Sequence, residues 1–358
     1  MTSLINPNPV YQIRVPGRVC FFGDHQDYLG LPAIAGAIDR YISLTANPNA
    51  QHQFVIHLIN TNTTLQLPVN PDLYTAKPNY FFSGLKVMID QGAQITQGFD
   101  ISIVGNIPMN AGLSSSTALV TAWIKLLAEV GFPHLDITKS QIAHWSHLAE
   151  VRFFNEPGGH MDHLTIADEG LIHINNKTFQ TERLESPFEC VLIAESGMAK
   201  QTLQTLKNAR SYAEQAIREV QIINPQFDIE KAAEGDVAHY VDAIDPKYRK
   251  HWYAAIHNHL ITQQALLLIK QQGTAQSLGL LMDAHQHILE HYIENTPKAM
   301  SQMMQAARQS GAYGAKIVGS GGGGVVVALC SKENKKDVIK AFMKTGAVNS
   351  YEVQLLNA

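Results

Sequence analysis

Cysteine is scarce in this 358-residue chain, and its three copies, Cys20, Cys190 and Cys330, lie far apart. They form no Cys-x-x-Cys pair, which argues against a cysteine-based zinc or redox motif and predicts reduced core thiols in a cytoplasmic protein. No run approaches the roughly 18 consecutive apolar residues of a membrane-spanning helix. The first twelve residues have no basic region followed by an apolar one, so no signal peptide is expected.

An excess of basic charge is also missing. The chain has 27 Lys and Arg residues against 31 Asp and Glu residues, a net charge of −4. Proteins that bind nucleic acid or membrane surfaces usually show a basic excess, so neither partner is expected, and no obligate protein partner is evident. With 45% hydrophobic residues and a mean hydropathy of −0.08, the composition is that of a globular protein with a substantial core.

Two domains are expected from the length and from the order of the elements. The first half reads as strands and three helices, with strands at 11–15, 18–22, 41–46, 54–59, 64–69, 99–104, 170–174 and 190–195, and helices at 79–92, 118–131 and 139–154. Helical patterns fill most of 201–307, followed by strands at 314–319 and 325–330, a helix at 334–344 and a strand at 350–356. Because the strands cluster, an α+β class with mainly antiparallel strands is predicted, with domains 1–185 and 186–358.

The stretch Pro16–Gly30, "PGRVCFFGDHQDYLG", sets Arg18, Asp24, His25 and Asp27 around two phenylalanines. A surface turn has no need of the aromatic rings, and a core strand does not tolerate unpaired charges. The pattern therefore predicts a strand that ends in a functional site.

A second stretch, "PMNAGLSSSTALVTAW", places a glycine, Gly112, and three serines where an apolar helix begins. Free N–H groups and the positive end of the helix dipole make such a start a natural phosphate site. The alternative is a serine cap without a ligand. It is not a Walker A loop, because no lysine stands at the required spacing.

A third stretch, "KIVGSGGGGVVVALC", satisfies G-x-G-x-x-G with Gly319, Gly321 and Gly324. A dinucleotide-binding loop opens a helix, whereas this one runs into the β-branched segment Val325–Val327, so a dehydrogenase is not expected. Four consecutive glycines indicate either a close approach to another backbone or ligand, or a tight β-turn.

In a fourth stretch, "HLAEVRFFNEPGGHMDHL", Glu150 and Asp162 flank a Pro-Gly-Gly break. One carboxylate suits a metal and the other a base, although a helix dipole alone also accounts for Asp162. His147, His160 and His163 lack the spacing of a zinc motif, so we interpret them as chance clustering. His285, His287 and His291 lie on a later predicted helix, where we interpret them as an exposed polar face.

In their order and separation, these stretches resemble the signature motifs of the GHMP kinases, the superfamily of galactokinase, homoserine kinase, mevalonate kinase and phosphomevalonate kinase. The similarity is greatest to galactokinases, whose first motif resembles PGRVNLIGEHTDYNGG and whose GIMDQ segment resembles "GGHMDH" here. "PNYFFSGLKVMI" is similar to the helix around their nucleotide pocket. The resemblance covers most of the chain. It implies a mixed βα N-terminal domain and a C-terminal ferredoxin-like α/β sandwich with extra helices.

The resemblance also implies an ATP-dependent kinase for a small-molecule sugar, with ATP as co-substrate and Mg²⁺ as cofactor. It assigns Asp162 as catalytic base and Arg18 as its partner. It assigns sugar binding to Asp24, His25, Asp27 and Gly159. It assigns ATP binding to Gly112, Leu113, Ser114, Ser115, Ser116, Gly321 and Gly322, and Mg²⁺ binding to Ser116 and Glu150. The glycines of the third stretch are expected to pack against the phosphate loop.

The chain departs from the galactokinase pattern at several positions. Asp24 replaces the usual glutamate, Gln26 replaces threonine, and Asn208 stands at about the position of a sugar-contacting tyrosine. The alternatives are therefore a kinase for a heptose, a uronic acid or a mevalonate-type alcohol, or a non-catalytic sugar sensor. Mevalonate kinases usually carry lysine where Arg18 stands and lack the H-x-D-Y sequence.

Overall fold

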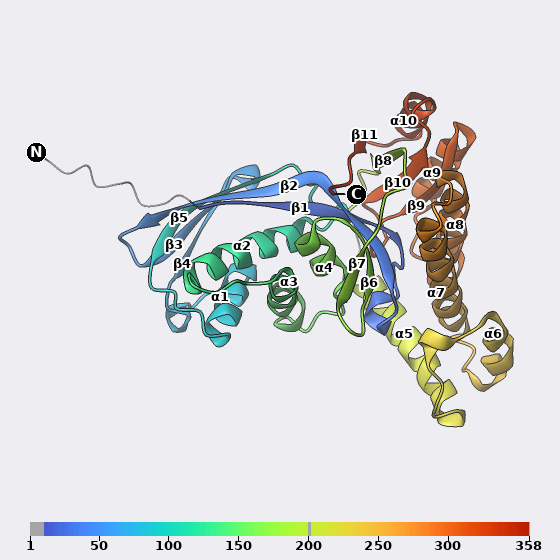
Figure 1. Ribbon diagram of the computed structural model, residues 1–358, viewed down its shortest axis with the longest axis horizontal. Helices are drawn as coiled ribbons and strands as arrows, with labels where there is room; N and C mark the ends of the chain where they lie inside the picture. Colours follow the sequence, from blue (N-terminus) through green and yellow to red (C-terminus); the bar gives the residue numbers. More distant parts are fainter. Residues whose placement is uncertain (1–10, 200–201, 358) are drawn as a thin grey trace, which may run out of the picture.

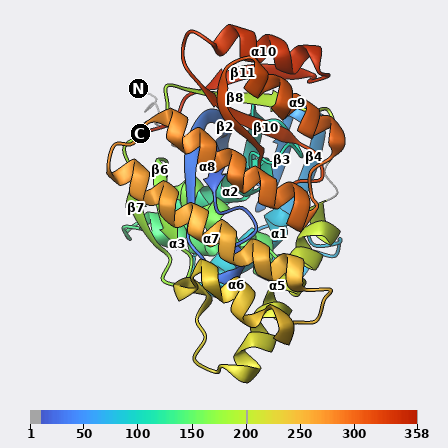
Figure 2. The ribbon, with the colours of Figure 1, turned by 90° about the vertical axis from the view of Figure 1, so that its right-hand side faces the viewer.

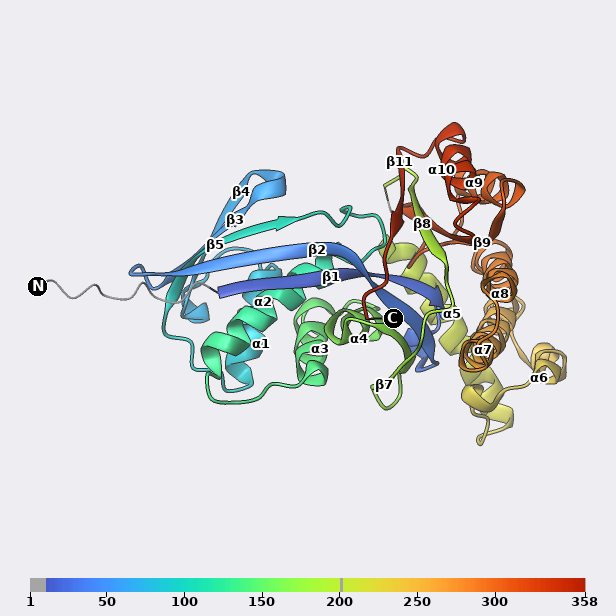
Figure 3. The ribbon, with the colours of Figure 1, turned by 45° about the horizontal axis from the view of Figure 1, so that its top comes forward.

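The computed structural model describes residues 11–199 and 202–357, and within them the strands form two sheets (Figure 1). The first sheet has seven strands in the order β4-β3-β5-β2-β6-β7, and β1 pairs with β2. Its strands are β1 (Tyr11–Phe22), β2 (Ala33–Asn49), β3 (Gln53–Leu58), β4 (Thr63–Pro68), β5 (Gly98–Gly105), β6 (Leu171–Asn175) and β7 (Gln180–Arg183). β1 and β2 run from the N-terminal end of the molecule into its centre (Figure 3).

β1 carries the first sequence motif toward the second domain. The predicted strands at 11–15 and 18–22 form one strand, paired antiparallel with β2 from Tyr11 opposite Ala46 onward. The register shifts between Pro16 and Gly17, where proline has no N–H to give to the ladder. Every described pair in this sheet is antiparallel except β3 with β5, which confirms the mainly antiparallel prediction.

Four helices cover one face of the first sheet (Figure 1). They are α1 (Tyr80–Asp90), α2 (Ser115–Gly131), α3 (Lys139–His147) and α4 (Met161–Asp168). The side chain of Asn79 caps α1, and Thr138 with Gln141 forms a capping box on α3, which satisfies N–H groups that lack helical partners. α2 packs tightly on α1: a Cβ atom on Gly84 would lie 2.5 Å from the Trp123 ring.

The second sheet is antiparallel throughout its described pairs and has the order β11-β8-β10-β9. Its strands are β8 (Cys190–Glu195), β9 (Ala312–Ile317), β10 (Val325–Cys330) and β11 (Asn349–Val353). The helices of this half are α5 (Thr202–Ile223), α6 (Glu234–Tyr240), α7 (Arg249–Lys270), α8 (Ala275–Ile288), α9 (Lys298–Gln309) and α10 (Lys335–Lys344). The order strand, helices, strand, strand, helix, strand is the ferredoxin-like pattern, as expected, with α5 and α6 among the added helices. α7 and α8 cross the molecule together in Figure 2.

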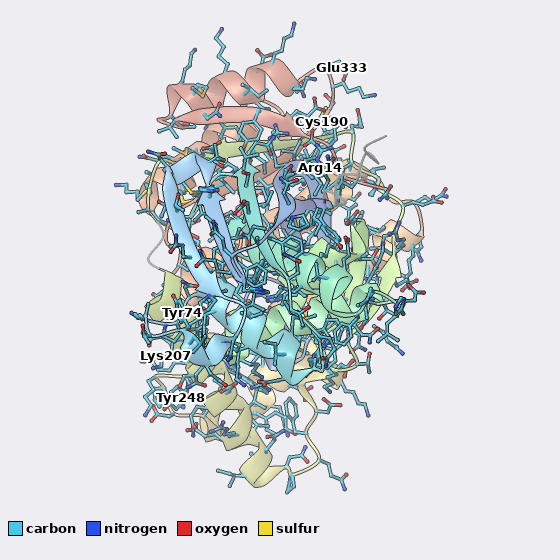
Figure 4. All side chains as sticks on the ribbon, turned by 90° about the vertical axis from the view of Figure 1, so that its left-hand side faces the viewer. Arg14, Tyr74, Cys190, Lys207, Tyr248 and Glu333 are labelled. Carbon is cyan, nitrogen blue, oxygen red and sulfur yellow. The ribbon has the colours of Figure 1, made fainter. Side chains whose placement is uncertain are left out.

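The chain passes from the first sheet to the second between Arg183 and Cys190 and returns near its end, where Leu355 pairs with Ile38. The domain limits 1–185 and 186–358 remain a prediction. Figure 4 looks from the N-terminal side, with Cys190 and Glu333 marking the second-sheet half and Tyr74 and Tyr248 the opposite end.

Some expectations need correction or fall outside the description. β7 was not expected, because its four residues are exposed and show no apolar alternation. The first ten residues, and Gln201 at the start of the predicted helical region, lie outside the described residues. Across residues 11–199 and 202–357, no helix has the length and apolar character needed to span a membrane.

Candidate active site

A cavity of about 250 Å³ opens where the ends of β1, α2 and α4 meet the loop after β9. All four sequence stretches contribute to its wall. The lining residues are Arg18, Asp24, His25, Asp27, Tyr28, Asn110, Gly112, Ser114, Ser115, Ser116, Thr117, Glu150, Val151, Glu156, Gly158, Gly159, Met161, Asp162, His163, Gly319 and Ser320.

The carboxylate of Asp162 is the point where three stretches converge. It lies in the first turn of α4, and Arg18 donates from Nε to Oδ1 and from Nη2 to Oδ2, each at 2.7 Å. The hydroxyl of Ser114 donates to Oδ2 at 2.5 Å. Burial would raise the pKa of Asp162, but the charge of Arg18 and the bonds from Arg18 and Ser114 outweigh it and lower the pKa. Asp162 is therefore an ionised, oriented carboxylate at neutral pH.

Backbone contacts fix the distance between β1 and the serine-rich loop. The N–H of Arg18 donates to the Leu113 carbonyl at 3.2 Å, and Arg18 Nη1 donates to the Gly112 carbonyl at 2.5 Å. A Cβ atom on Gly17 would lie 2.8 Å from the Leu113 oxygen, so only glycine permits this approach. Leu113, predicted to bind ATP, is fully buried and is not among the lining residues; it anchors the loop from behind.

The serine-rich loop presents the start of α2 to the cavity. Ser114 adopts a left-handed conformation with φ of 59°, and α2 begins at Ser115. The first N–H groups of a helix have no acceptor within it, and Ser115, Ser116 and Thr117 all line the cavity. This is the anion-binding geometry that the sequence predicts for a phosphate loop.

Glu150 lies on the cavity wall in a π-helical turn, Leu148–Arg152, that continues α3. It is 6% exposed, and its Oε2 atom accepts a hydrogen bond from His163 Nε2 at 2.9 Å. Ser116, on the same wall, is exposed. A carboxylate and a hydroxyl are hard oxygen donors of the kind that Mg²⁺ prefers, so these two residues fit the predicted ion.

The histidines near Glu150 are also close to one another in space. The rings of His147 and His160 stack with centroids 3.6 Å apart, and His163 meets His147 edge-on at 5.2 Å. Burial, followed by the charges of the other two histidines, lowers the pKa of His147 to about 2. No described group of three or more His, Cys, Asp or Glu side chains is arranged to hold a metal ion. His285 was expected on an exposed face but is completely buried.

Asp27 meets the Pro-Gly-Gly turn across the cavity. A Cβ atom on Gly159 would lie 2.2 Å from Asp27 Oδ2, so a glycine is required there. Burial, followed by the charge of Asp162, raises the pKa of Asp27 to about 7. Asp27 and Asp162 thus form a pair of nearby carboxyl groups with pKa values shifted in opposite directions.

Asp24 and His25 also line the cavity, but their polar atoms are bonded within the protein. Asp24 Oδ1 accepts the Gly319 N–H at 2.7 Å, and Asp24 Oδ2 lies 2.5 Å from Lys316 Nζ. His25 Nε2 lies 3.0 Å from the Ser320 carbonyl, and its Nδ1 lies 3.2 Å from the Tyr28 hydroxyl. Each carboxylate oxygen of Asp24 therefore already has a partner in the second domain.

The second glycine-rich loop meets the cavity through Gly319 and Ser320, whereas Gly321 and Gly322, predicted to bind ATP, are not among the lining residues. The Gly322 N–H donates to the Asn295 carbonyl at 2.6 Å. A Cβ atom on Gly321 would lie 2.6 Å from Asn295. The four glycines therefore serve a close approach of backbones, and their contacts are to Asn295 and to the segment 198–199 rather than to the phosphate loop.

Sequence reasoning missed two residues of this region. Lys316 is fully buried beside Asp24, and the signal was available, because a lone lysine in an apolar strand needs a partner. Tyr28 lines the cavity one residue after the motif aspartate. Asn208, at about the position of the missing tyrosine, is exposed and does not line the cavity.

Comparison with known proteins identifies related families and sequences. Residues 79–170 match the profile described as GHMP kinases N terminal domain, residues 264–348 match GHMP kinases C terminal, and residues 4–48 match the galactokinase galactose-binding signature. The chain is 25% identical to galactokinase of Pyrococcus furiosus, with 93% of this chain and 92% of the relative covered. It is 24% identical to mevalonate kinase of Methanocaldococcus jannaschii, with 96% and 99% covered.

Solved structures share the fold. The structure of Lactococcus lactis galactokinase complexed with galactose superposes with a TM-score of 0.86 at 19% identity, covering 98% of this chain and 94% of that one. Methanococcus jannaschii mevalonate kinase gives a TM-score of 0.71 at 20% identity, covering 98% and 99%. With the three matched profiles, the chain belongs to the GHMP kinase family and is an ATP-dependent small-molecule kinase.

Proposed function

We propose that the chain transfers the γ-phosphoryl group of ATP to the anomeric hydroxyl of a monosaccharide, as galactokinases do. The observation that carries this proposal is the Asp162 carboxylate, which Arg18 and Ser114 hold at the junction of three of the four stretches. The galactose-binding signature over residues 4–48 supports a sugar as the acceptor. The three cysteines of the chain are buried and form no disulfide, which fits a reducing compartment, and the cytoplasm is proposed as the location of the protein.

The nucleotide would place its phosphates at the start of α2. Ser115, Ser116 and Thr117 line the cavity at this helix start, and their backbone N–H groups would neutralise charge that spreads over the transferred group. The adenine is assigned to the space between α1 and this loop. There, Tyr80 packs edge-on against Phe154 with ring centroids 5.4 Å apart, and burial, followed by the charges of Glu150 and Glu156, raises the pKa of Tyr80 to about 12.

Ser116 and Glu150 would hold Mg²⁺. When bound, this ion supplies positive charge to the β- and γ-phosphates. Glu150 is itself held by His163, whose Nε2–H group donates to one of the two carboxylate oxygens. His163 contacts only Oε2, so Oε1 of Glu150 is the oxygen that would bind the cation.

Asp162 would accept a hydrogen bond from the acceptor hydroxyl and orient it for in-line attack. Its lowered pKa makes it a weak base, which suits an anomeric hydroxyl because this is the most acidic hydroxyl of a sugar. Asp27 and the Gly159 backbone line the adjacent wall and are proposed to fix the sugar ring. Orientation of this kind supplies a large part of the rate enhancement in phosphoryl transfer.

Two alternatives carry specific observations. Mevalonate kinases are among the relatives, but Arg18 and the sequence His25-Gln26-Asp27-Tyr28 favour a sugar. A heptose or a uronic acid is the remaining kinase alternative. A sugar sensor without activity is disfavoured by the complete network around Asp162.

The direct test is an assay of ADP release with ATP and a panel of hexoses, heptoses, uronic acids and mevalonate. Turnover with a hexose is expected. Turnover with mevalonate and with no sugar would contradict the proposal, and binding of a sugar without turnover would favour the sensor. In the same assay Asp162→Asn is expected to lose its turnover. Asp168→Asn, at the opposite end of α4, is its matched control and is expected to keep its activity.

A further inference from the structure

Two short segments from opposite ends of the chain meet beside the cavity. One is Gly23–His25, which follows β1 in the first sheet. The other is Lys316–Ser320, which ends β9 and opens the second glycine-rich loop. Asp24 and Lys316 are separated by 292 residues in sequence, yet their charged atoms lie 2.5 Å apart. The contact therefore joins the two sheets.

The ion pair is isolated from solvent and its polar atoms are satisfied. The side chain of Lys316 is 0% exposed and that of Asp24 is 1% exposed. Besides Asp24, the Lys316 ammonium donates to the carbonyls of Ile317 at 2.6 Å and Cys20 at 3.3 Å. Three donors thus meet three acceptors, the condition under which a buried ammonium is tolerated.

The second carboxylate oxygen extends the contact to the loop. Asp24 Oδ1 accepts the Gly319 N–H at 2.7 Å, so one side chain holds both the end of β9 and the first glycine after it. Burial would raise the pKa of Asp24, but the charge of Lys316, its hydrogen bond and smaller contributions from other neighbours together outweigh burial and lower the pKa. His285, packed nearby, has its pKa lowered to about 3 by burial and then by Lys316, so it brings no competing charge.

His25 repeats the pattern one residue later. His25 Nε2 lies 3.0 Å from the Ser320 carbonyl and 3.0 Å from Asn295 Nδ2, and Nδ1 lies 3.2 Å from the Tyr28 hydroxyl, so both ring nitrogens have polar partners. The buried side chain of Asn295 donates to the same Ser320 carbonyl at 3.2 Å. His25 has a φ of 61°, a left-handed conformation that costs free energy for a non-glycine residue and persists only where surrounding contacts hold it.

We infer that Asp24 and His25 are positioning residues rather than sugar ligands. Together with Lys316 they form a connection between the two domains, which we call the interdomain latch. The latch consists of the bonds that Lys316 and Gly319 donate to Asp24 and of the contact between His25 and Ser320. The latch holds Gly319 and Ser320 in the cavity wall, opposite the phosphate loop. Aspartate in place of the longer glutamate at this position brings the carboxylate to the lysine and leaves Asp27 and Asp162 as the motif acids that face the substrate. The role in substrate binding rests on the proposed function; the latch itself does not.

The latch is tested first without any ligand. Lys316→Met and Asp24→Asn each leave one buried partner without its charge, and each is expected to lower the folding equilibrium constant on the order of a hundredfold or more. The double variant removes both charges and is expected to be more stable than either single variant. Hydrogen exchange at the amides of 318–322 is expected to accelerate in each variant. Two results would overturn the latch. One is a double variant that is no more stable than the less stable single variant, and the other is an unchanged hydrogen-exchange rate at the Gly319 amide.

A partly exposed ion pair of the same domain provides the control. Lys335 and Glu352 are 35% and 24% exposed and lie 2.9 Å apart. Lys335→Met, Glu352→Gln and their combination are expected to change stability little and additively, because exposed pairs contribute little. If the two substitutions of this exposed pair were also strongly coupled, the comparison of single and double variants would respond to the loss of any charge and would not be specific to the latch.

The role in catalysis is tested with D-galactose and MgATP. A positioning role predicts that Asp24→Asn and Lys316→Met raise the KM for the sugar by similar factors. The double variant is expected to raise it by about the same factor as each single variant, not by the product of the two factors. A raised KM in Asp24→Asn with normal KM in Lys316→Met would show that Asp24 binds the sugar directly and would overturn the assignment. If the wild type phosphorylates no sugar, the proposed function fails, whereas the exchange and stability measurements still decide the latch.

Discussion

The two glycine-rich loops have similar compositions but do different things. The loop before α2 ends in a left-handed Ser114 and opens a helix, and Ser115, Ser116 and Thr117 in its first turn line the cavity. The loop before β10 runs into a strand, and its N–H groups are bonded to Asp24, Asn295 and Met198. The element that follows a glycine-rich loop decides whether its donors serve a ligand or the protein itself.

This comparison predicts which substitutions act on chemistry and which act on folding. Residues tied to the first loop are expected to change turnover and to leave stability nearly intact. Residues of the second loop are expected to change stability, with activity following the folded fraction. The predictions below test that division in order of decreasing effect.

The largest effect is expected for Asp162→Asn. Loss of the charged acceptor should lower kcat on the order of a thousandfold, while the variant still folds and binds ATP. Its stability should fall less than that of Asp24→Asn, because the Asp162 side chain is 28% exposed. Steady-state kinetics, ATP titration by calorimetry and thermal unfolding are the measurements. Turnover near the wild-type value would remove Asp162 from the reaction.

The sharpest comparison pairs one variant from each loop. Ser114→Ala removes one of the three bonds that orient Asp162 and leaves the two from Arg18, so kcat should fall about ten- to a hundredfold with a smaller effect on unfolding. Gly321→Ala places a Cβ at a φ of 74° and against Asn295, and should cost about 2–4 kcal/mol of stability. The opposite pattern, with a stability loss in the first variant and a kinetic loss in the second, would reverse the assignment of the loops.

The different roles of the two loops can be predicted from the sequence where they depend on neighbouring residues, but not where they depend on contacts between residues far apart in the chain. The helix after Ser114 and the strand after Gly324 follow from local apolar patterns, and both were predicted. The partners of the second loop were not, because Asp24 reaches it only through the packing of the two domains and Asn295 only through the packing of the second domain. Burial of His285 and the contact of Lys316 with Asp24 depend on the same packing and escaped local reasoning.

A smaller effect is expected at His163, which holds Glu150 from behind. His163→Leu should raise the Mg²⁺ concentration for half-maximal activity about tenfold, as loss of a residue that orients a metal ligand commonly does. His163→Gln keeps a side-chain N–H donor and should stay within a few-fold of the wild type. Mn²⁺ binding followed by electron paramagnetic resonance, with ADP present, gives the same comparison without turnover. Equal affinities in the leucine and glutamine variants would contradict the role of His163.

The smallest effect concerns the pH dependence of stability at Asp27. Its pKa in the folded protein is about 7, above the ordinary value of 3.8. The stability that it contributes is therefore fully present below about pH 4 and is lost as the pH rises toward 7. A pKa unit corresponds to about 1.4 kcal/mol, and partial exposure of Asp27 reduces the total to about 1–2 kcal/mol.

Asp27→Asn should abolish this slope. Denaturant unfolding between pH 4 and 8 should then show a variant that gains stability relative to the wild type as the pH rises. Parallel curves for the two proteins would show that the pKa of Asp27 is not raised in the folded state.

The central claim is that the Asp162 cavity directs ATP to the anomeric hydroxyl of a sugar. Phosphorus NMR of the product formed from ATP, Mg²⁺ and D-galactose tests it most directly. The account predicts a single sugar phosphate whose phosphorus couples to the anomeric proton, absent with Asp162→Asn. A phosphate on another hydroxyl of the sugar, or the same product from the Asp162 variant at the wild-type rate, would contradict it.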